Sequence, residues 1–290
     1  MLRPSAPRPF RSRLLFGSLA AALTATTLLS GCGGSAKAAA PVGPTLPPVL
    51  QGDPTQVVAA AAGRTVGSPN AGIAITVPVL QEGKLASVNG EGTADFPGSR
   101  LRLVVPNAEK AEERQFNRSL FVLLPEQAAP LLAGKKWVKL DLDQAKSASP
   151  DPFNLYAFDP KQLVTAVTAV THGTVVGPEQ VRGAATTHFT GTLDPSAVTS
   201  SGVDSTFAAQ FAKATKGAAT PVDVWLDDTG LVRKMSIQLP PPGAALTAGS
   251  NPIASVELYD FGTADVSFTQ PPAAEVAGLD DLSGLSGHGD

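Results

Sequence analysis

An alternation of apolar and polar residues with a period of two recurs along most of the chain after residue 70, and it constrains the fold more than any other feature. In segment 221–227, Val222, Val224 and Leu226 share one side, and a turn follows at 228–230. The segments predicted as strands cover residues 72–79, 84–96, 99–105, 116–124, 137–142, 174–181, 185–193, 221–227, 235–239, 255–261 and 263–268. Such alternation is typical of an antiparallel sheet with one covered face and one solvated face.

Three segments follow the helical period instead. Residues 53–64 open with Asp53-Pro54, a cap followed by a proline at the first helical position, and residues 206–216 form a second, shorter helix. The strongest helical signal spans residues 159–171, where the apolar residues are Leu163, Val164, Val167 and Val170. About ten strands and a few helices predict an α+β fold: a single, strongly curved antiparallel half-barrel sheet covered by helices. A sheet this large must curl, and a curled sheet under helices can enclose an apolar space.

The N-terminus is typical of a secretory signal peptide. Residues 1–13 carry four arginines and no acidic residue, and residues 14–29 form a charge-free run rich in Leu and Ala. This run of about sixteen residues is shorter than the roughly 20 that a membrane-spanning helix needs. It ends in small residues without a basic stop-transfer cluster. We therefore expect a removable export signal.

The signal ends in a lipobox, the recognition sequence of bacterial lipoproteins. Leu29, Ser30 and Gly31 precede Cys32, whose sulfur would receive a diacylglyceryl group before cleavage on its N-terminal side. Acyl chains such as palmitate would then anchor the mature protein to the outer face of the cell membrane. The alternative is a signal peptide without lipidation, in which the cysteine is incidental. Since Cys32 is the single cysteine of the sequence, no internal disulfide is expected.

Composition divides the rest of the chain. Residues 32–52, rich in Pro, Ala and Gly, are predicted to form a tether after the lipidated cysteine, residues 53–277 one domain, and residues 278–290 a disordered tail. Removal of residues 1–31 with their four arginines would change the formal net charge from −3 to about −7. A mildly acidic surface of this kind is not expected to bind nucleic acid.

The sequence offers little catalytic chemistry. His172 and His188 have no cluster of partner residues and are interpreted as structural or surface groups, and His288 lies in the tail. No G-x-S-x-G, Walker, H-E-x-x-H or paired-cysteine motif is present, and residues 227–230 are better explained as a turn than as part of a calcium loop. We therefore predict no catalytic residue, metal site or cofactor. An unrecognised carboxylate pair is the remaining route to an enzyme.

Several short motifs occur in a fixed order along the chain: GEGTADF at 90–96, KWVKLD at 136–141, VRG at 181–183 with THFTGTLD at 187–194, PVDVWLDD at 221–228 with GLVRK at 230–234, and YDFG at 259–262. Together they resemble the pattern of actinobacterial LppX/LprG-type lipoproteins of the LolA-like superfamily. The chain departs from that pattern at His188-Phe189, where the family has His-Tyr, and in the spacing of residues 106–115. The resemblance implies an open half-barrel closed by helices, which carries acylated lipid or lipoglycan.

Two functions from different classes remain open at this point. The first is an extracytoplasmic lipoprotein that binds a lipid or another hydrophobic ligand without forming a covalent bond. The residues expected to line its cavity are Ile73, Ile75, Leu101, Leu103, Val138, Leu140, Leu163, Val167, Val222, Val224 and Leu226. The alternative for these residues is a filled core. The second function is an envelope sensor or regulatory lipoprotein that acts through a membrane protein partner, which the sequence does not identify.

Overall fold

Twelve strands form one sheet in the part of the chain that the computed structural model describes, residues 46–81, 84–106, 111–126, 130, 132–141, 159–240 and 251–278. The strands are β1 Asn70–Gln81, β2 Lys84–Asp95, β3 Arg100–Val105, β4 Ala111–Phe116, β5 Ser119–Leu123, β6 Trp137–Asp141, β7 Val170–Val181, β8 Ala184–Leu193, β9 Thr220–Asp227, β10 Val232–Gln238, β11 Ile253–Tyr259 and β12 Val276–Ala277. The predicted signal peptide, Cys32, the predicted tether up to residue 45 and the predicted tail from residue 279 lie outside the described residues.

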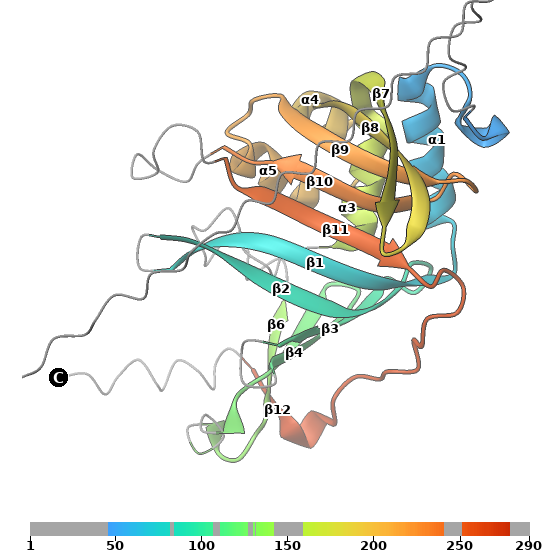
Figure 1. The fold of residues 1–290 in the computed structure, drawn as a ribbon. Helices are drawn as coiled ribbons and strands as arrows, with labels where there is room; N and C mark the ends of the chain where they lie inside the picture. The colour runs from blue at the N-terminus through green and yellow to red at the C-terminus, as the bar shows by residue number, and fades with distance from the viewer. Residues whose placement is uncertain are drawn as a thin grey trace, which may run out of the picture. The chain divides into compact units, whose positions relative to one another are not determined.

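The order of the strands shows that the sheet is not closed, and Figure 1 shows that it is curved. It runs β12-β6-β5-β4-β3-β2-β1-β11-β10-β9-β8-β7, so β7 and β12 are the two edges (Figure 1). Every neighbouring pair is antiparallel except β12 with β6. The pairing of β1 with β11 joins an N-terminal half, β1 to β6, to a C-terminal half, β7 to β11. The predicted α+β fold with a single curved antiparallel sheet is therefore confirmed.

The helices gather on one half of the sheet. They are α1 Pro54–Val66, α3 Pro160–Ala166, α4 Pro195–Thr199 and α5 Ser205–Ala214, with the short 3-10 helices η1 Pro48–Leu50, η4 Val167–Ala169 and η5 Ala273–Glu275. Figure 1 shows α1, α3, α4 and α5 beside strands β7 to β11, whereas β3 to β6 lie below them. We call the sheet face toward these helices the inner face and the opposite one the outer face. Among the described helices, none is both long and apolar enough to cross a bilayer.

Helix α1 forms where the cap signal predicts it. The Asp53 carboxylate accepts a hydrogen bond from the backbone N–H of Gln56 at 3.0 Å, and Pro54 occupies the first turn. The buried side of the helix consists of Val57, Val58, Ala61, Ala62 and Thr65. The Thr65 hydroxyl accepts a hydrogen bond from the backbone N–H of Val232 at 2.9 Å, which ties the helix to β10.

The cap of α1 gives a first prediction. Asp53→Ala removes the acceptor for one free helical N–H, so we expect the free energy of unfolding to fall by about 1 kcal/mol. Urea denaturation of the purified protein measures this loss. Asp53→Asn keeps a capping oxygen and serves as the control, with an expected loss of only a few tenths of a kcal/mol. Equal losses in the two variants would show that the cap does not stabilise this helix.

The core lies between the helices and the inner face of the sheet. Along β1 the inward residues Ile73 and Ile75 are buried while Ala74 and Thr76, which alternate with them, are partly exposed, as the predicted alternation requires. Leu50 of η1 is also buried in this core, so the segment just before α1 packs against the domain.

Two strands occupy the region where one was predicted. Instead of a strand over 116–124, the chain forms β4, turns at Asn117-Arg118 and returns as β5. Phe116 at the end of β4 pairs with Ser119 at the start of β5. The inward positions of β4 are Ala111, Glu113 and Gln115, so the apolar alternation that predicts a strand is missing. Residue Leu142 of the predicted strand 137–142 lies outside the described residues.

The helix predicted over 159–171 is shorter than expected. It ends at Ala166, continues as η4, and gives way to β7 at Val170, which pairs with Leu193 of β8. Pairing along β8 therefore decides the conformation of Val170, although its spacing also fits a helix. As a consequence, His172 lies in β7 with a left-handed backbone and not at the end of a helix. The helix α4, introduced by Asp194-Pro195, was not predicted.

The strand predicted over 263–268 is absent from the structure. Strand β11 already pairs with β1 on one side and β10 on the other, so no edge remains for a returning strand. Residues 263–275 instead form the C-terminal strap, a segment without a strand that ends in η5 and leads to β12 at the edge of β6. The strap contacts the outer face of β3 and β4: Arg114 donates to the carbonyl oxygen of Thr269 at 2.8 Å, and the Phe268 ring lies 5.7 Å from the Phe116 ring.

Candidate functional site

The residues expected to line a cavity fall into two groups in the structure. Nine of them belong to the main core under the helices: Ile73, Ile75, Leu101, Leu103, Leu163, Val167, Val222, Val224 and Leu226. Val138 and Leu140 belong to a separate, smaller cluster with Leu132, Ala277 and Leu124. The structure thus brings the nine together in a helix-covered layer and places the other two on the far part of the same sheet.

The inner face of β3 to β6 forms a largely apolar surface. Cross-strand pairs share a face, and the pairs Leu103–Glu113, Glu113–Val122 and Val122–Val138 connect the four strands on the side of the buried Leu103. The strand residues on this face are Leu101, Leu103, Val105, Ala111, Glu113, Gln115, Leu120, Val122, Val138 and Leu140. Val122 and Leu140 are only partly buried. None of the apolar side chains of β4, β5 or β6 packs in the helix-covered core, as far as the described residues show.

Glu113 is the charged residue of this apolar face. No described residue donates a hydrogen bond to its carboxylate or forms an ion pair with it, and burial raises its pKa from the ordinary 4.5 to about 7. Gln115, two residues along the same strand, is buried and donates from Nε2 to the carbonyl oxygen of Asn117 at 3.1 Å. Near neutral pH, therefore, the neutral and ionised forms of Glu113 are both populated.

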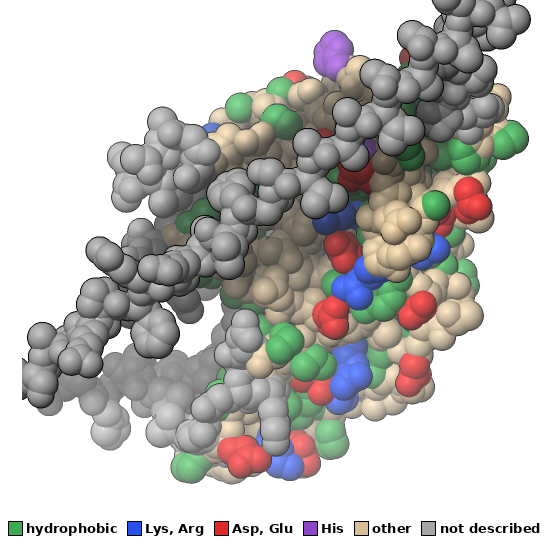
Figure 2. Space-filling model, in the orientation of Figure 1, with side chains coloured by type: hydrophobic (Ala, Val, Ile, Leu, Met, Phe, Trp, Pro, Cys, Tyr) green, Lys and Arg blue, Asp and Glu red, His purple; other side chains and the backbone are tan. Residues whose placement is uncertain are grey.

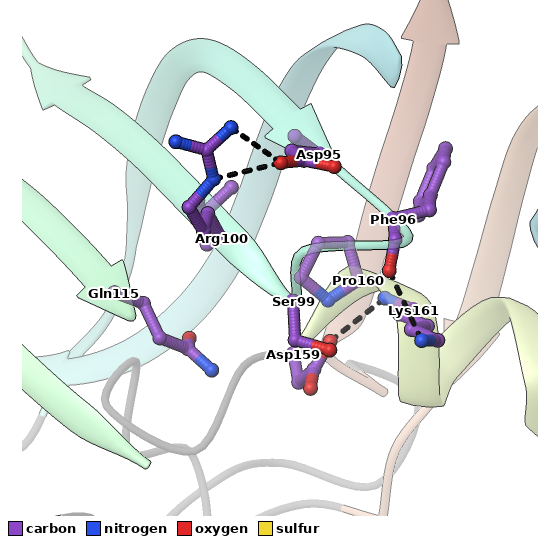
Figure 3. Close-up of a pocket in the computed structure, with 10 residues that line it drawn as sticks. Asp95, Phe96, Ser99, Arg100, Gln115, Asp159, Pro160 and Lys161 are labelled. Carbon is purple, nitrogen blue, oxygen red and sulfur yellow. Dashed lines mark hydrogen bonds and ion pairs between the residues drawn. The ribbon is translucent and has the colours of Figure 1, made fainter. Parts of the chain in front are cut away.

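A small hollow separates Gln115 from the start of α3. Figure 3 shows it between the β2–β3 turn and the helix, lined by Asp95, Arg100, Asp159 and other residues. Its volume is about 10 Å³, which is room for one water molecule and not for a ligand. Lys161 donates to the carbonyl oxygen of Phe96 at 3.0 Å and so ties the helix to this turn.

Asp159 caps α3 beside that hollow. Its carboxylate accepts hydrogen bonds from the backbone N–H groups of Lys161 and Gln162 at 2.9 and 3.4 Å. Burial nevertheless raises the pKa of Asp159, and the nearby charge of Asp204 raises it further. The start of α3 is therefore a second place where a buried carboxyl adjoins the inner side of the sheet.

The outer face carries a network of charged and aromatic groups. The rings of His188 and Trp225 stack at 4.3 Å, and Trp225 donates from its indole nitrogen to Glu179 at 2.7 Å. The two ring nitrogens of His188 contact carboxylate oxygens of Glu179 and Asp223 at 2.9 and 3.0 Å. Phe189 points the opposite way into the core, so the two neighbouring rings lie on different faces of β8.

Arg182 continues this network at the tip of the β7–β8 hairpin. It pairs with Glu91 at 2.7 Å and Glu257 at 2.8 Å, and its guanidinium lies over the Tyr259 ring. In Figure 2, Lys and Arg side chains alternate with Asp and Glu along this face. A hollow of about 260 Å³ adjoins Arg182 and is lined mainly by outer-face residues, among them Asn89. It lies on the opposite side of the sheet from the apolar candidates.

The described residues contain no group of three or more His, Cys, Asp or Glu side chains placed to hold a metal ion. The residues 227–230 form the turn that the sequence predicts, since the Asp227 carboxylate accepts from the backbone N–H groups of Thr229 and Leu231 at 3.0 Å and pairs with Arg233 at 2.7 Å. Its oxygens are therefore used within the turn.

Some known proteins are similar to this chain in sequence or in fold. No protein-family model matches the chain. A curated relative from Streptomyces griseus, an uncharacterized 31.2 kDa protein in the rplA-rplJ intergenic region, is 28% identical over 181 residues. The match covers 59% of this chain and 57% of the relative, so the chain spans little more than half of that protein.

Solved structures match over most of the chain. LprF from Mycobacterium bovis aligns with a TM-score of 0.45 at 18% identity, covering 75% of this chain and 95% of LprF. The lipoprotein LppX from Mycobacterium tuberculosis gives 0.40 at 15% identity, covering 73% and 97%. A LolA superfamily protein from Nitrosomonas europaea gives 0.33 at 8% identity, covering 76% and 99%. At these identities the likeness to each of these structures is one of fold.

The sequence did not point to Glu113, Gln115 or Val122 as site residues. Strand β4 reads AEERQF, in which no hydrophobic side chain alternates with the charged ones. A usable signal was the two-residue turn Asn117-Arg118 between Phe116 and Ser119, which marks a hairpin and so places a strand before it. Counting in twos from Phe116 puts Arg114 and Glu112 on one face of that strand, which leaves Glu113 and Gln115 on the other.

Proposed function

We propose that the chain is a membrane-anchored extracytoplasmic lipoprotein that binds a lipid or another hydrophobic ligand non-covalently on the inner face of β3 to β6. The observation that carries this proposal is that Leu120, Val122, Val138 and Leu140 of the inner face lie outside the helix-covered core, with Val122 and Leu140 partly exposed. Apolar side chains that the core does not cover are typical of a surface that receives a partner or ligand. The proposal assigns no reaction to the protein.

The dimensions of this face suit an acyl chain. Four strands spaced about 4.8 Å apart span roughly 14 Å, and five residues extend about 17 Å along each strand. Each methylene group that leaves water for such a surface contributes about 0.8 kcal/mol. Ten methylenes would contribute about 8 kcal/mol, which is comparable with the roughly 4 to 15 kcal/mol that association costs.

The proposed location rests on the N-terminal sequence. Export by the signal in 1–31 and acylation of Cys32 would place the domain at the outer face of the membrane. The thirteen residues 33–45 between Cys32 and the described Leu46 span at most about 45 Å when extended. That length lets the domain reach the bilayer surface while it stays anchored. We also propose that residues 53–277 form one domain and residues 278–290 a tail.

The binding proposal predicts the effect of a polar residue on the inner face. Val122→Asp is expected to weaken the binding of a fluorescent fatty-acyl probe at least tenfold, because it brings a charge onto the apolar surface beside Glu113. The protein for this test is the mature chain 32–290 with Cys32→Ser, which carries no acyl group of its own. Native mass spectrometry with solvent extraction, on protein made in a bacterial host, reports any lipid that copurifies.

A matched variant separates binding from general damage. Val175 lies on β7, the edge of the sheet opposite to β6 and β12, and is 41% exposed, so Val175→Asp adds the same charge far from the inner face of β3 to β6. We expect it to bind the probe like the parent protein. A parent protein that carries no extractable lipid and binds no acyl probe would overturn the proposed function.

The second candidate function, a sensor that acts through a membrane protein, is favoured by one observation. Strand β7 is an edge of the sheet and exposes Val175 and Val176. An edge strand of this kind offers backbone groups to an added strand from a partner. Cross-linking in membranes, followed by capture, would recover one stoichiometric partner if this function holds, and Val176→Lys would remove it. Recovery of no such partner would leave the carrier function alone.

A further inference from the structure

The inner face of β3 to β6 contains one ionisable group in an otherwise uncharged surface. Glu113 pairs across the strands with Leu103 and Val122, both apolar. Its neighbour on the same face, Gln115, uses its amide N–H toward Asn117, which leaves its carbonyl oxygen as an acceptor. A ligand on this face therefore meets one carboxyl and one amide oxygen.

Every other described charge on these four strands lies on the outer face. These residues are Arg100, Arg102, Glu112, Arg114, Lys139 and Asp141. Glu112 holds both Arg102 and Arg114 at 2.7 Å, and Arg114 also lies over the Trp137 ring. No Lys or Arg of the described strands β3 to β6 is thus available to neutralise an anion bound on the inner face.

Among the described residues, the other titratable side chains near this region are those at the start of α3 and Lys136, which precedes β6 in the same alternation as Val138 and pairs with Glu275 at 3.4 Å. Asp159 and Lys161 approach Gln115 around the small hollow. Lys161 is held by the carbonyl oxygen of Phe96, and burial is the single cause of the raised pKa of Glu113, so neither group acts on it appreciably. The charge state at the centre of the inner face is therefore that of Glu113 itself.

We propose that Glu113 makes the inner face select amphiphiles by charge, admitting those with an uncharged, hydrogen-bonding head group and rejecting acyl anions. This inference rests on the ligand binding proposed above and adds the class of ligand. In its neutral form the carboxyl donates a hydrogen bond to an ester or hydroxyl oxygen of the ligand. A fatty-acid carboxylate would instead meet a carboxyl and an amide oxygen, with no cation to balance its charge after desolvation.

The same arrangement makes binding depend on pH. Below pH 7, Glu113 is mostly neutral and can donate. Above it, the ionised form must be reprotonated or desolvated before an apolar ligand covers it, so affinity for an uncharged amphiphile falls as the pH rises. At 1.5 pH units above a pKa of about 7, the affinity for the uncharged amphiphile is expected to be lower by up to about thirtyfold.

The test compares two probes with the same acyl chain, 1-monooleoylglycerol and oleate, on the mature chain 32–290 with Cys32→Ser. Each displaces a hydrophobic fluorescent dye, at pH 6 and pH 8.5. We expect the parent protein to bind the monoglyceride at least tenfold more tightly than oleate at pH 6, and to lose about tenfold of the monoglyceride affinity at pH 8.5. Glu113→Gln should keep the affinity seen at pH 6 but lose its pH dependence, and Glu113→Lys should favour oleate.

The controls make each outcome decisive. Glu112→Gln changes a carboxylate on the same strand but on the outer face, and we expect no change in probe preference. Circular dichroism checks that each variant is folded, and Glu113→Gln, which is nearly isosteric, keeps the test valid if the lysine variant unfolds. Equal binding of both probes by the parent protein and Glu113→Gln at both pH values would overturn the charge selection while leaving ligand binding intact. Failure of every variant to bind either probe would overturn both proposals.

Discussion

Replacement of Gly92 with alanine is expected to lower the free energy of unfolding by about 4 kcal/mol, enough to leave much of the protein unfolded at 37 °C. Gly92 lies in β2 between Ile73 of β1 and Leu103 of β3. A Cβ atom at this position would overlap the backbone carbonyl oxygen of Arg102 and lie 3.0 Å from the Cα atom of Leu103. Because these are backbone atoms, relief requires the paired strands to separate.

The neighbouring glycine provides the control for this prediction. Gly90 belongs to the same GEGTADF segment, but a Cβ atom there would meet the side chain of Ile75 at 3.2 Å. A side chain can adjust by a few tenths of an ångström, so Gly90→Ala should change stability by less than about 1 kcal/mol. Urea denaturation of both variants checks the contrast. Similar stabilities would show that β2 and β3 are not as close at Gly92 as the structure has them.

Stability is expected to fall as the pH rises from 5 to 8, and Glu113→Gln should remove this dependence. Burial raises the pKa of Glu113 from 4.5 to about 7 in the folded protein. The contribution of Glu113 to the free energy of unfolding is therefore fully present below its ordinary pKa of 4.5 and is lost as the pH rises through about 7. A shift of this size corresponds to about 3 kcal/mol, and we expect about 2 to 3 kcal/mol because the side chain is partly exposed. Glu113→Gln should therefore be more stable than the parent protein at pH 8 and similar at pH 5.

Glu112→Gln tests whether this effect belongs to the inner face. Burial alone would raise the pKa of Glu112, but its bonds to Arg102 and Arg114 lower it overall. Its contribution to stability is therefore present above pH 4.5 and lost at more acid pH. Glu112→Gln should lower stability by a similar amount at every pH between 5 and 8. Denaturant curves at four pH values distinguish the two slopes, and a parent protein whose stability does not change between pH 5 and 8 would contradict the assignment.

The position of Glu113 shows why part of the site escaped the sequence. A strand is predicted from alternating apolar residues, and β4 places Ala, Glu and Gln on its inner side. Its pairing with β3 and β5 holds it in the sheet despite this composition. Polar residues are admitted there because the helix-covered core does not extend over β4.

The segment after β11 shows a second limit. The residues 263–268 alternate well enough to predict a strand, yet β11 has β1 and β10 on its two sides. The local sequence does not show that both edges of β11 are already paired, because β1 lies far away in the sequence. Phe268, one of the apolar residues of this alternation, packs against Phe116 on the outer face instead.

The sequence by itself determined the class of fold, most of its strands and the residues of the main core. It could do so because alternation and capping act between near neighbours, as at Ile73, Ile75 and Asp53. Only the tertiary structure decided which strands became neighbours, where the helix-covered core ends, and that Val138 and Leu140 lie apart from the other cavity candidates. The physical reason is that the environment of a side chain such as Glu113, and with it its pKa, is set by residues from other strands that the local sequence does not contain.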